Sequence, residues 1–325
     1  SSNQEAELQQ LEDSLRERLD SLRQESGFPG ATLAVSLPDG SLVNLAVGFD
    51  GPHSDSPMPP GARMFSGSTG KTFVSAVTLQ LVDEGRLALD DMVGDYLGDE
   101  AWFSRLPNGP DLTVRMLLSH TGGLPRYVFK EEFWAALNES PDRVWDPEEL
   151  IAYILDEDPV HPAGNGWHYS DTDYLLIGLI IEKVTGSTYH DEQARRLLTP
   201  LHLDDTAPPP GRVIEGLVAG ITGDEPQFHL NRTVMVDGEY IFDPRWEWTG
   251  GGLVTTVSDM ARWGRNLYGG DVLSEEMRRE LLTFVDTETG MPADTGYGLG
   301  VQGWDSELGI IYGHGGIFPG YQTQF

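Results

Sequence analysis

The chain contains no cysteine and no long apolar run, and it is poor in basic residues. Without cysteine there is no disulfide framework and no thiolate metal site. The sequence therefore does not indicate whether the protein functions in an oxidising or a reducing compartment. A membrane-spanning helix needs about 18 consecutive apolar residues, and the sequence predicts none. Lys and Arg total 21 against 52 Asp and Glu, which gives a net charge of −31. A field of that sign repels nucleic acids and anionic membranes, so neither is an expected partner.

What the chain does contain is enough apolar material for a large globular core. It has 325 residues, of which 39% are hydrophobic, as in ordinary globular proteins. Its first residues, 1–4, show no charged and then apolar signal pattern, although a signal peptide can be removed from a mature chain. We expect export to the periplasm or the extracellular space after such removal.

The sequence is organised around residues 65–72, which lead into an apolar pattern at three- and four-residue steps. This pattern predicts a helix over about residues 68–84. Ser68 and Lys71 then lie on one face of its first turn, a nucleophile beside a base. A lysine is a base only when it is neutral, and the positive end of the helix favours a neutral amine at Lys71. Taken alone, an S-x-x-K spacing is also compatible with a surface serine and a solvated lysine.

Residues 65–72 do not match two other motifs, the phosphate-binding loop and the nucleophile elbow. A phosphate-binding loop requires a glycine where Phe65 stands, and a nucleophile elbow requires one where Ser66 stands.

Periodicity and turn signals predict further elements along the chain. The expected helices cover residues 5–25, 131–156, 175–184, 257–267 and 274–284. The expected strands cover residues 31–37 and 41–48 (a hairpin), 232–236, 240–242, 250–256, and 297–302 with 309–316 (a second hairpin). Strand-rich ends around a helical middle indicate an α/β domain, residues 1–60 plus 250–325, with a mainly helical domain, residues 61–249, inserted into it.

Several polar and aromatic residues are ambiguous on their own. His120 closes a predicted helix and is interpreted as a capping or hydrogen-bonded structural residue. Tyr169, at the mouth of a helix, is either a proton relay or a half-buried aromatic residue. His161 and His168 are poorly spaced for metal binding, and no metal or cofactor is expected.

Three separated motifs then occur in a specific order: Ser68-x-x-Lys71, Tyr169-Ser170-Asp171 and His314-Gly315-Gly316. This order resembles the penicillin-recognising serine hydrolases, especially the branch of class C β-lactamases, soluble D-alanyl-D-alanine carboxypeptidases and related esterases. The similarity extends over most of residues 25–325. It implies a β-lactamase/transpeptidase-like α/β fold, an antiparallel sheet flanked by helices.

The resemblance also implies a mechanism. Ser68 would attack a carbonyl group and form an acyl-enzyme, with Lys71 and Tyr169 handling the proton. The backbone N–H groups of Ser68 and Ile317 would form the oxyanion hole. His314 would stand where other branches place a lysine and would polarise Tyr169 or the substrate.

The expected substrate-binding residues depart from the pattern of that branch. Asp171 stands where the pattern has Asn. Gly315, followed by Gly316, occupies a position where peptidases use Thr, and Gln302 lies where soluble carboxypeptidases place Arg. A free C-terminal carboxylate loses charge-assisted partners there. Esters, amides or lactams that lack this carboxylate are therefore favoured over D-Ala-D-Ala termini.

Members of this branch continue beyond the third motif, whereas this sequence stops at Phe325. We expect the last strands and the C-terminal helix to be missing, and a companion C-terminal fragment is one partner that would supply them. Two functions remain open: a serine acyl hydrolase of small-molecule or peptide substrates, and a penicillin-binding or sensing protein with little turnover. Metal-dependent hydrolysis is a third and weaker hypothesis, because the histidines show no ligand spacing.

Overall fold

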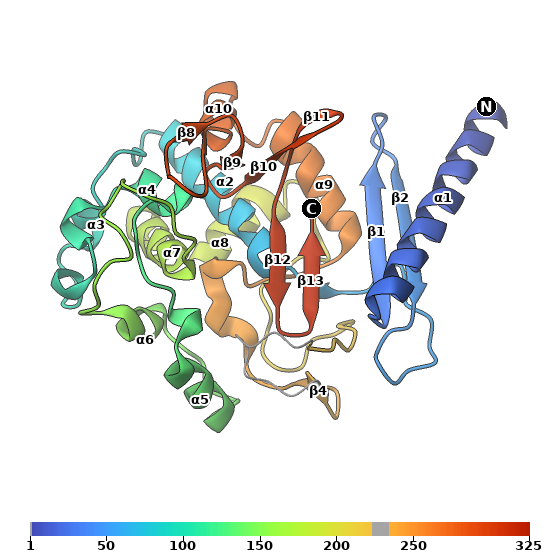
Figure 1. Ribbon diagram of the computed structural model, residues 1–325, viewed down its shortest axis with the longest axis horizontal. Coiled ribbons are helices and arrows are strands. Elements are labelled where there is room, and N and C mark those ends of the chain that lie inside the picture. The colour runs from blue at the N-terminus through green and yellow to red at the C-terminus, as the bar shows by residue number, and fades with distance from the viewer. Residues whose placement is uncertain (1, 223–233) are drawn as a thin grey trace.

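The computed structural model of the protein describes residues 2–222 and 234–325, with side chains from residue 5 onward. Figure 1 shows the long helix α1 and the hairpin β1–β2 on one side of the molecule, and the helices α3 to α7 on the other. The paired strands β12 and β13 lie between these two groups. The expected combination of helices with antiparallel strand pairs is therefore confirmed, and the division into two domains stays a prediction.

The N-terminal helix and hairpin form where the sequence predicts them. Helix α1 covers Ser2–Ser26, and β1 (Gly30–Ser36) pairs antiparallel with β2 (Leu42–Gly48). Alternate β2 residues, Val43, Leu45 and Val47, are buried, as expected of a strand with one face on the core. Helices α1 and α9 both pack against this hairpin.

Two helices in the centre of the molecule position the functional motifs. Helix α2 (Lys71–Asp83) follows the 3-10 turn η1 (Gly67–Gly70), and helix α7 (Asp171–Thr185) packs against α2. Both helices are apolar on most of their surface and are buried along most of their length, as expected of helices inside a large core. The first residues of both helices are therefore fixed by tertiary packing.

None of the remaining described helices is longer than α2. They are α3 (Gly94–Leu97), α4 (Val114–Ser119), α5 (Glu131–Glu139), α6 (Pro147–Ile151), α8 (Tyr189–Gln193), α9 (Val257–Gly269) and α10 (Glu275–Leu281). The single helix expected over 131–156 is wrong, because α5 ends before Pro141 and α6 starts anew with Pro147 at its first position. Proline interrupts a helix but suits its first turn. Trp134 and Trp145 are buried, which confirms their expected packing role.

The C-terminal strands differ from the expected hairpin. Strands β7 (Phe284–Val285), β8 (Pro292–Ala293), β9 (Gly296–Tyr297), β10 (Gln302–Ser306) and β11 (Gly309–Gly313) form one sheet in the order β11-β10-β9-β7-β8. The partner of β11 is therefore residues 302–306 and not 297–302. Gly300, at φ +82°, lies in the bend between β9 and β10, a conformation that favours glycine. Strand β12 (Gly315–Phe318) begins after His314 and pairs with β13 (Tyr321–Gln324).

A short strand pair joins the segment before Ser68 to the glycine-rich segment at 250–252. Strand β3 (Met64–Phe65) pairs with β6 (Val254–Thr255), so the strand expected over 250–256 is correct only at its end. Residues Pro244–Gly250 form a 3-10 segment, η8, instead. Further short strands are β4 (Met235–Val236) and β5 (Glu239–Tyr240), and residues 232–233 of the expected strand lie outside the described residues. Within the described ranges, no helix has the length and apolar character needed to cross a bilayer.

Candidate active site

Ser68 lies on the 3-10 turn that precedes helix α2, as the sequence analysis placed it at the start of a helix. Its neighbours Gly67, Thr69 and Gly70 are buried, whereas Ser68 is only partly buried. The turn is fixed by Ser66, whose hydroxyl donates to the Gly251 carbonyl at 2.8 Å. The backbone therefore presents one hydroxyl, that of Ser68, toward accessible space.

Lys71 is fully buried one turn after Ser68. Its Nζ donates to Ser68 Oγ at 3.3 Å, to Asp171 Oδ1 at 3.0 Å and to the Gly250 carbonyl at 2.6 Å. A lysine ammonium has three hydrogens to donate, so these three acceptors match the charged form. Burial alone would lower the pKa of Lys71, but Tyr169 and Asp171 outweigh burial and raise it. The expected neutral amine is therefore wrong for the resting site.

Asp171 is the carboxylate that pairs with Lys71. It is the first residue of α7, and it lies between Lys71 and Arg126. Arg126 donates to Asp171 Oδ2 from Nε at 3.1 Å and from Nη2 at 2.8 Å. Burial would raise the pKa of Asp171, but the two cations lower it well below its ordinary value. Asp171 is an ionised carboxylate with a cation on each oxygen.

Sequence reasoning missed Arg126. It directly follows Gly122-Gly123-Leu124-Pro125, and its partner Asp171 is 45 residues away in the sequence.

Tyr169 lies against both cations. The centroid of its ring is 4.9 Å from Lys71 Nζ and 4.9 Å from the guanidinium carbon of Arg126. Its hydroxyl is buried without a well-formed hydrogen bond to any described residue. Burial raises the pKa of Tyr169, although Lys71 and Ser68 act in the opposite direction. Tyr169 is therefore a neutral phenol beside the nucleophile and the lysine.

His314 reaches the same cluster, with its ring centroid 6.2 Å from that of Tyr169. Its Nδ1 donates to the Gly315 carbonyl at 2.6 Å, and its Nε2 accepts from the Tyr297 hydroxyl at 2.8 Å. Burial lowers the pKa of His314 to about 3, with a smaller effect in the same direction from Lys71. His314 is thus a neutral imidazole and cannot supply the positive charge of a lysine at this position.

Strand β12 closes the other side of the turn. A Cβ atom added to Gly67 would lie 2.6 Å from the backbone nitrogen of Ile317, and one added to Gly316 would lie 3.1 Å from that of Ser68. The two N–H groups expected to form the oxyanion hole thus belong to segments in direct contact. Gln302 accepts from the Gly315 backbone N–H at 3.0 Å and so supports the start of β12.

Comparison with known proteins agrees with this geometry. The family described as Beta-lactamase matches residues 11–325. The chain belongs to the β-lactamase family.

Several known proteins are similar to this chain in sequence or in structure. Penicillin-binding protein 4 of Amycolatopsis lactamdurans is 29% identical, over 94% of this chain and 79% of that protein. A D-stereospecific amidohydrolase from Streptomyces sp. has a TM-score of 0.78 and 28% identity, over 92% of this chain and 85% of that one. A D-amino acid amidase from Ochrobactrum anthropi SV3 superimposes with a TM-score of 0.79 at 23% identity, over 95% of this chain and 86% of that one. Its likeness supports the β-lactamase fold alone.

Within this β-lactamase-family site, His120 and Glu247 are two further buried polar groups. His120 ends α4 with φ +60°, which confirms the expected capping role. Its Nδ1 also lies 2.7 Å from Asp173 Oδ2, and its ring centroid is 4.2 Å from that of Tyr169. Glu247, on η8, is buried with Oε2 unpartnered among the described residues, and burial raises its pKa to about 8.

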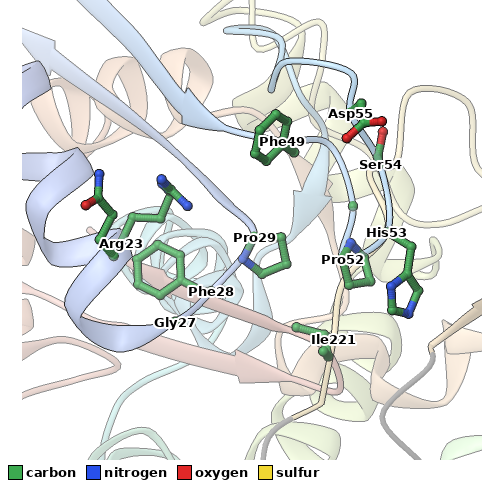
Figure 2. A pocket seen from close by; sticks show the side chains of 12 residues that line it. Arg23, Gly27, Phe28, Pro29, Phe49, Pro52, His53, Ser54, Asp55 and Ile221 are labelled. Atoms are coloured by element: carbon green, nitrogen blue, oxygen red, sulfur yellow. The ribbon is translucent and has the colours of Figure 1, made fainter.

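Among the described residues, the cluster around Ser68 includes no metal-binding group and is separate from a surface hollow. In the described part of the chain, no group of three or more His, Asp or Glu side chains is arranged to hold a metal ion. A hollow of about 700 Å³ lies between the end of α1 and the loop after β2, where Phe28, Pro29 and Phe49 line it (Figure 2). None of the residues around Ser68 lines that hollow.

Proposed function

We propose that this protein is a serine hydrolase that cleaves an amide, lactam or ester bond through an acyl-enzyme on Ser68. The observation that carries the proposal is the contact of Ser68 Oγ with Lys71 Nζ at 3.3 Å, on a turn that β12 approaches closely. Membership of the β-lactamase family and the similarity to a D-stereospecific amidohydrolase support it.

The proposed reaction begins with attack of Ser68 Oγ on the substrate carbonyl. The oxygen of the tetrahedral intermediate would accept from the N–H groups of Ser68 and Ile317. The Ser68 proton would pass to a neutral Lys71, directly or through Tyr169, and then to the departing nitrogen or oxygen. Water would attack the acyl-enzyme in the same way and release the acid.

The mechanism requires Lys71 to change its charge. Lys71 must first lose a proton to become a base, and Asp171 opposes that loss. We therefore expect the rate of acylation to rise with pH into the alkaline range. The neutral imidazole of His314 accepts a hydrogen bond from the Tyr297 hydroxyl and does not act as a cation.

The charged state of Lys71 also supports a second candidate function, that of a penicillin-binding or sensing protein with little turnover. A lysine that is kept charged gives slow acylation or slow release at neutral pH. This candidate predicts one slow turnover per molecule, whereas the first predicts repeated turnover.

One experiment separates the candidates. Hydrolysis of nitrocefin, p-nitrophenyl butyrate and D-phenylalanine amide is measured side by side at pH 7 and pH 9, with Ser68→Ala as the control. Steady turnover of any of the three that Ser68→Ala abolishes supports the hydrolase. A stoichiometric burst followed by no turnover supports the binding protein, and activity that survives Ser68→Ala contradicts both.

A further inference from the structure

The guanidinium of Arg126, close to the nucleophile, has one nitrogen that no described residue binds. Its Nε and Nη2 atoms bind Asp171, and Nη1 has no hydrogen-bond partner among the described residues. Nη1 is also absent from the buried atoms that lack a partner, and the side chain is 22% exposed. One nitrogen of this guanidinium is therefore open to solvent and available to a ligand.

The guanidinium is held rigidly in this position. Its central carbon lies 4.2 Å from the centroid of the Phe129 ring and 4.9 Å from that of Tyr169. Contact with aromatic rings and a carboxylate fixes the plane of a guanidinium. A fixed planar donor is suited to a carboxylate.

Arg126 is also close to the reacting atoms. Asp171 links it to Lys71, which donates to Ser68 Oγ, and both cations contact the ring of Tyr169. Since each is 4.9 Å from the centroid of that ring, they are at most about 10 Å apart. A substrate whose carbonyl lies at Ser68 can therefore reach Arg126 with a short chain.

Phe129 supplies an apolar surface at this point. Phe129 is 54% exposed, and its ring packs against the guanidinium. An exposed aromatic ring beside a free cation matches a ligand with a short hydrocarbon chain that ends in an anion. The net charge of −31 repels anions in general, so a local cation is needed to bind one.

We propose that Arg126 and Phe129 form a subsite for a carboxylate at the end of the acyl group, so that preferred substrates are acyl donors derived from dicarboxylic acids. This inference rests on the proposed acyl-transfer function. It concerns the acyl part of the substrate and not the C-terminal carboxylate whose usual partners are absent at Gly315 and Gln302.

The test compares two esters that share a leaving group, p-nitrophenyl butyrate and mono-p-nitrophenyl glutarate. The wild-type protein should show a higher kcat/KM for the glutarate ester, mainly through a lower KM. Arg126→Gln should reduce the glutarate-to-butyrate ratio by about 10- to 100-fold, as expected for the loss of a charge-assisted hydrogen bond. Any general effect of this variant on Asp171 and Lys71 cancels in the ratio.

Arg143 provides a matched control. It also stacks on an aromatic ring, 3.8 Å from the centroid of Trp145, and donates to a carboxylate, Glu149, at 2.7 Å. Arg143→Gln removes the same charge and should leave the ratio unchanged. An unchanged ratio in Arg126→Gln, or a wild-type preference for butyrate, overturns the subsite.

A binding measurement separates this inference from the proposed function. Calorimetry on Ser68→Ala should show glutarate binding at least about 10-fold more tightly than butyrate, and Arg126→Gln in the same background should abolish the difference. If neither ester is hydrolysed but this difference is found, the hydrolase proposal fails and the subsite stands. If the esters are hydrolysed and no difference in binding is found, the subsite fails and the hydrolase stands.

Discussion

Asp171→Asn is expected to make the protein a better catalyst at neutral pH. Asp171 stabilises the charged form of Lys71 through a buried contact of 3.0 Å. Asparagine removes that charge but keeps an oxygen that accepts from Nζ. Arg126 then loses its counter-charge and becomes a further cation near Lys71. Both effects favour the neutral amine, so they lower the pKa of Lys71 and increase the fraction that can accept the Ser68 proton.

The size of the effect follows from the distance. Two unit charges 3.0 Å apart attract by roughly 5 kcal/mol at an effective dielectric constant of about 20. Part of this attraction is retained by the asparagine dipole, and part is offset by water entering the site. The net change in a lysine that loses one close carboxylate is typically about 10- to 1,000-fold in the fraction of free amine at a fixed pH.

The assay is the pH dependence of kcat/KM for p-nitrophenyl butyrate between pH 5 and pH 10. The variant should reach its alkaline plateau at a lower pH than the wild type, even if the plateau itself is lower. Asp173→Asn is the control, because this carboxyl is also buried at the start of α7 but its partner is His120 and not Lys71. A midpoint that stays in place or moves to higher pH in Asp171→Asn refutes the reasoning.

Three further predictions concern the buried groups around the site. Burial raises the pKa of Glu247 to about 8, so the free energy of unfolding should fall as pH rises from about 4.5 to 8. Glu247→Gln should remove this pH dependence and increase the free energy of unfolding at pH 8 by roughly 3–5 kcal/mol. Urea titration measures this, and an unchanged pH dependence contradicts the prediction. Burial lowers the pKa of His314 to about 3, so the free energy of unfolding of the wild type should decrease as pH falls through about 6.5. Between pH 7 and pH 4.5, His314→Gln should lose roughly 2–3 kcal/mol less of this free energy than the wild type does. Equal acid sensitivity of the two proteins in the same titration counts against a buried neutral imidazole. In Gly316→Ala the new Cβ would lie 2.1 Å from the Ser66 carbonyl oxygen, so acylation measured by stopped flow should slow by about 100- to 1,000-fold, whereas Gly61→Ala, whose Cβ meets nothing within 4 Å, should react at the wild-type rate.

Local patterns in the sequence were enough to predict the elements that carry the nucleophile. The hairpin β1–β2 and the helices α2 and α7 follow from alternation and from three- and four-residue periodicity. The expected helix over 131–156 is wrong because Pro141 follows the end of α5 and Pro147 begins a new helix. Strand β10 was missed because its residues, 302–306, are mostly exposed and polar.

The order of motifs placed Ser68, Lys71, Tyr169 and His314, and the structure brings these four residues into one cluster. Their charges could not be predicted in the same way. The state of Lys71 depends on a carboxylate 100 residues away in sequence, and that of His314 depends on burial. Arg126 and Glu247 carry no motif of their own, because only tertiary packing brings them to the site.

The most direct test of the account is the site of covalent modification. The intact protein is treated with a fluorophosphonate at pH 8 and analysed by whole-protein and peptide mass spectrometry, with Ser68→Ala alongside. The account predicts one adduct per molecule, located on Ser68 and absent from Ser68→Ala. No adduct on the folded protein, or an adduct on another residue that persists in Ser68→Ala, would contradict it.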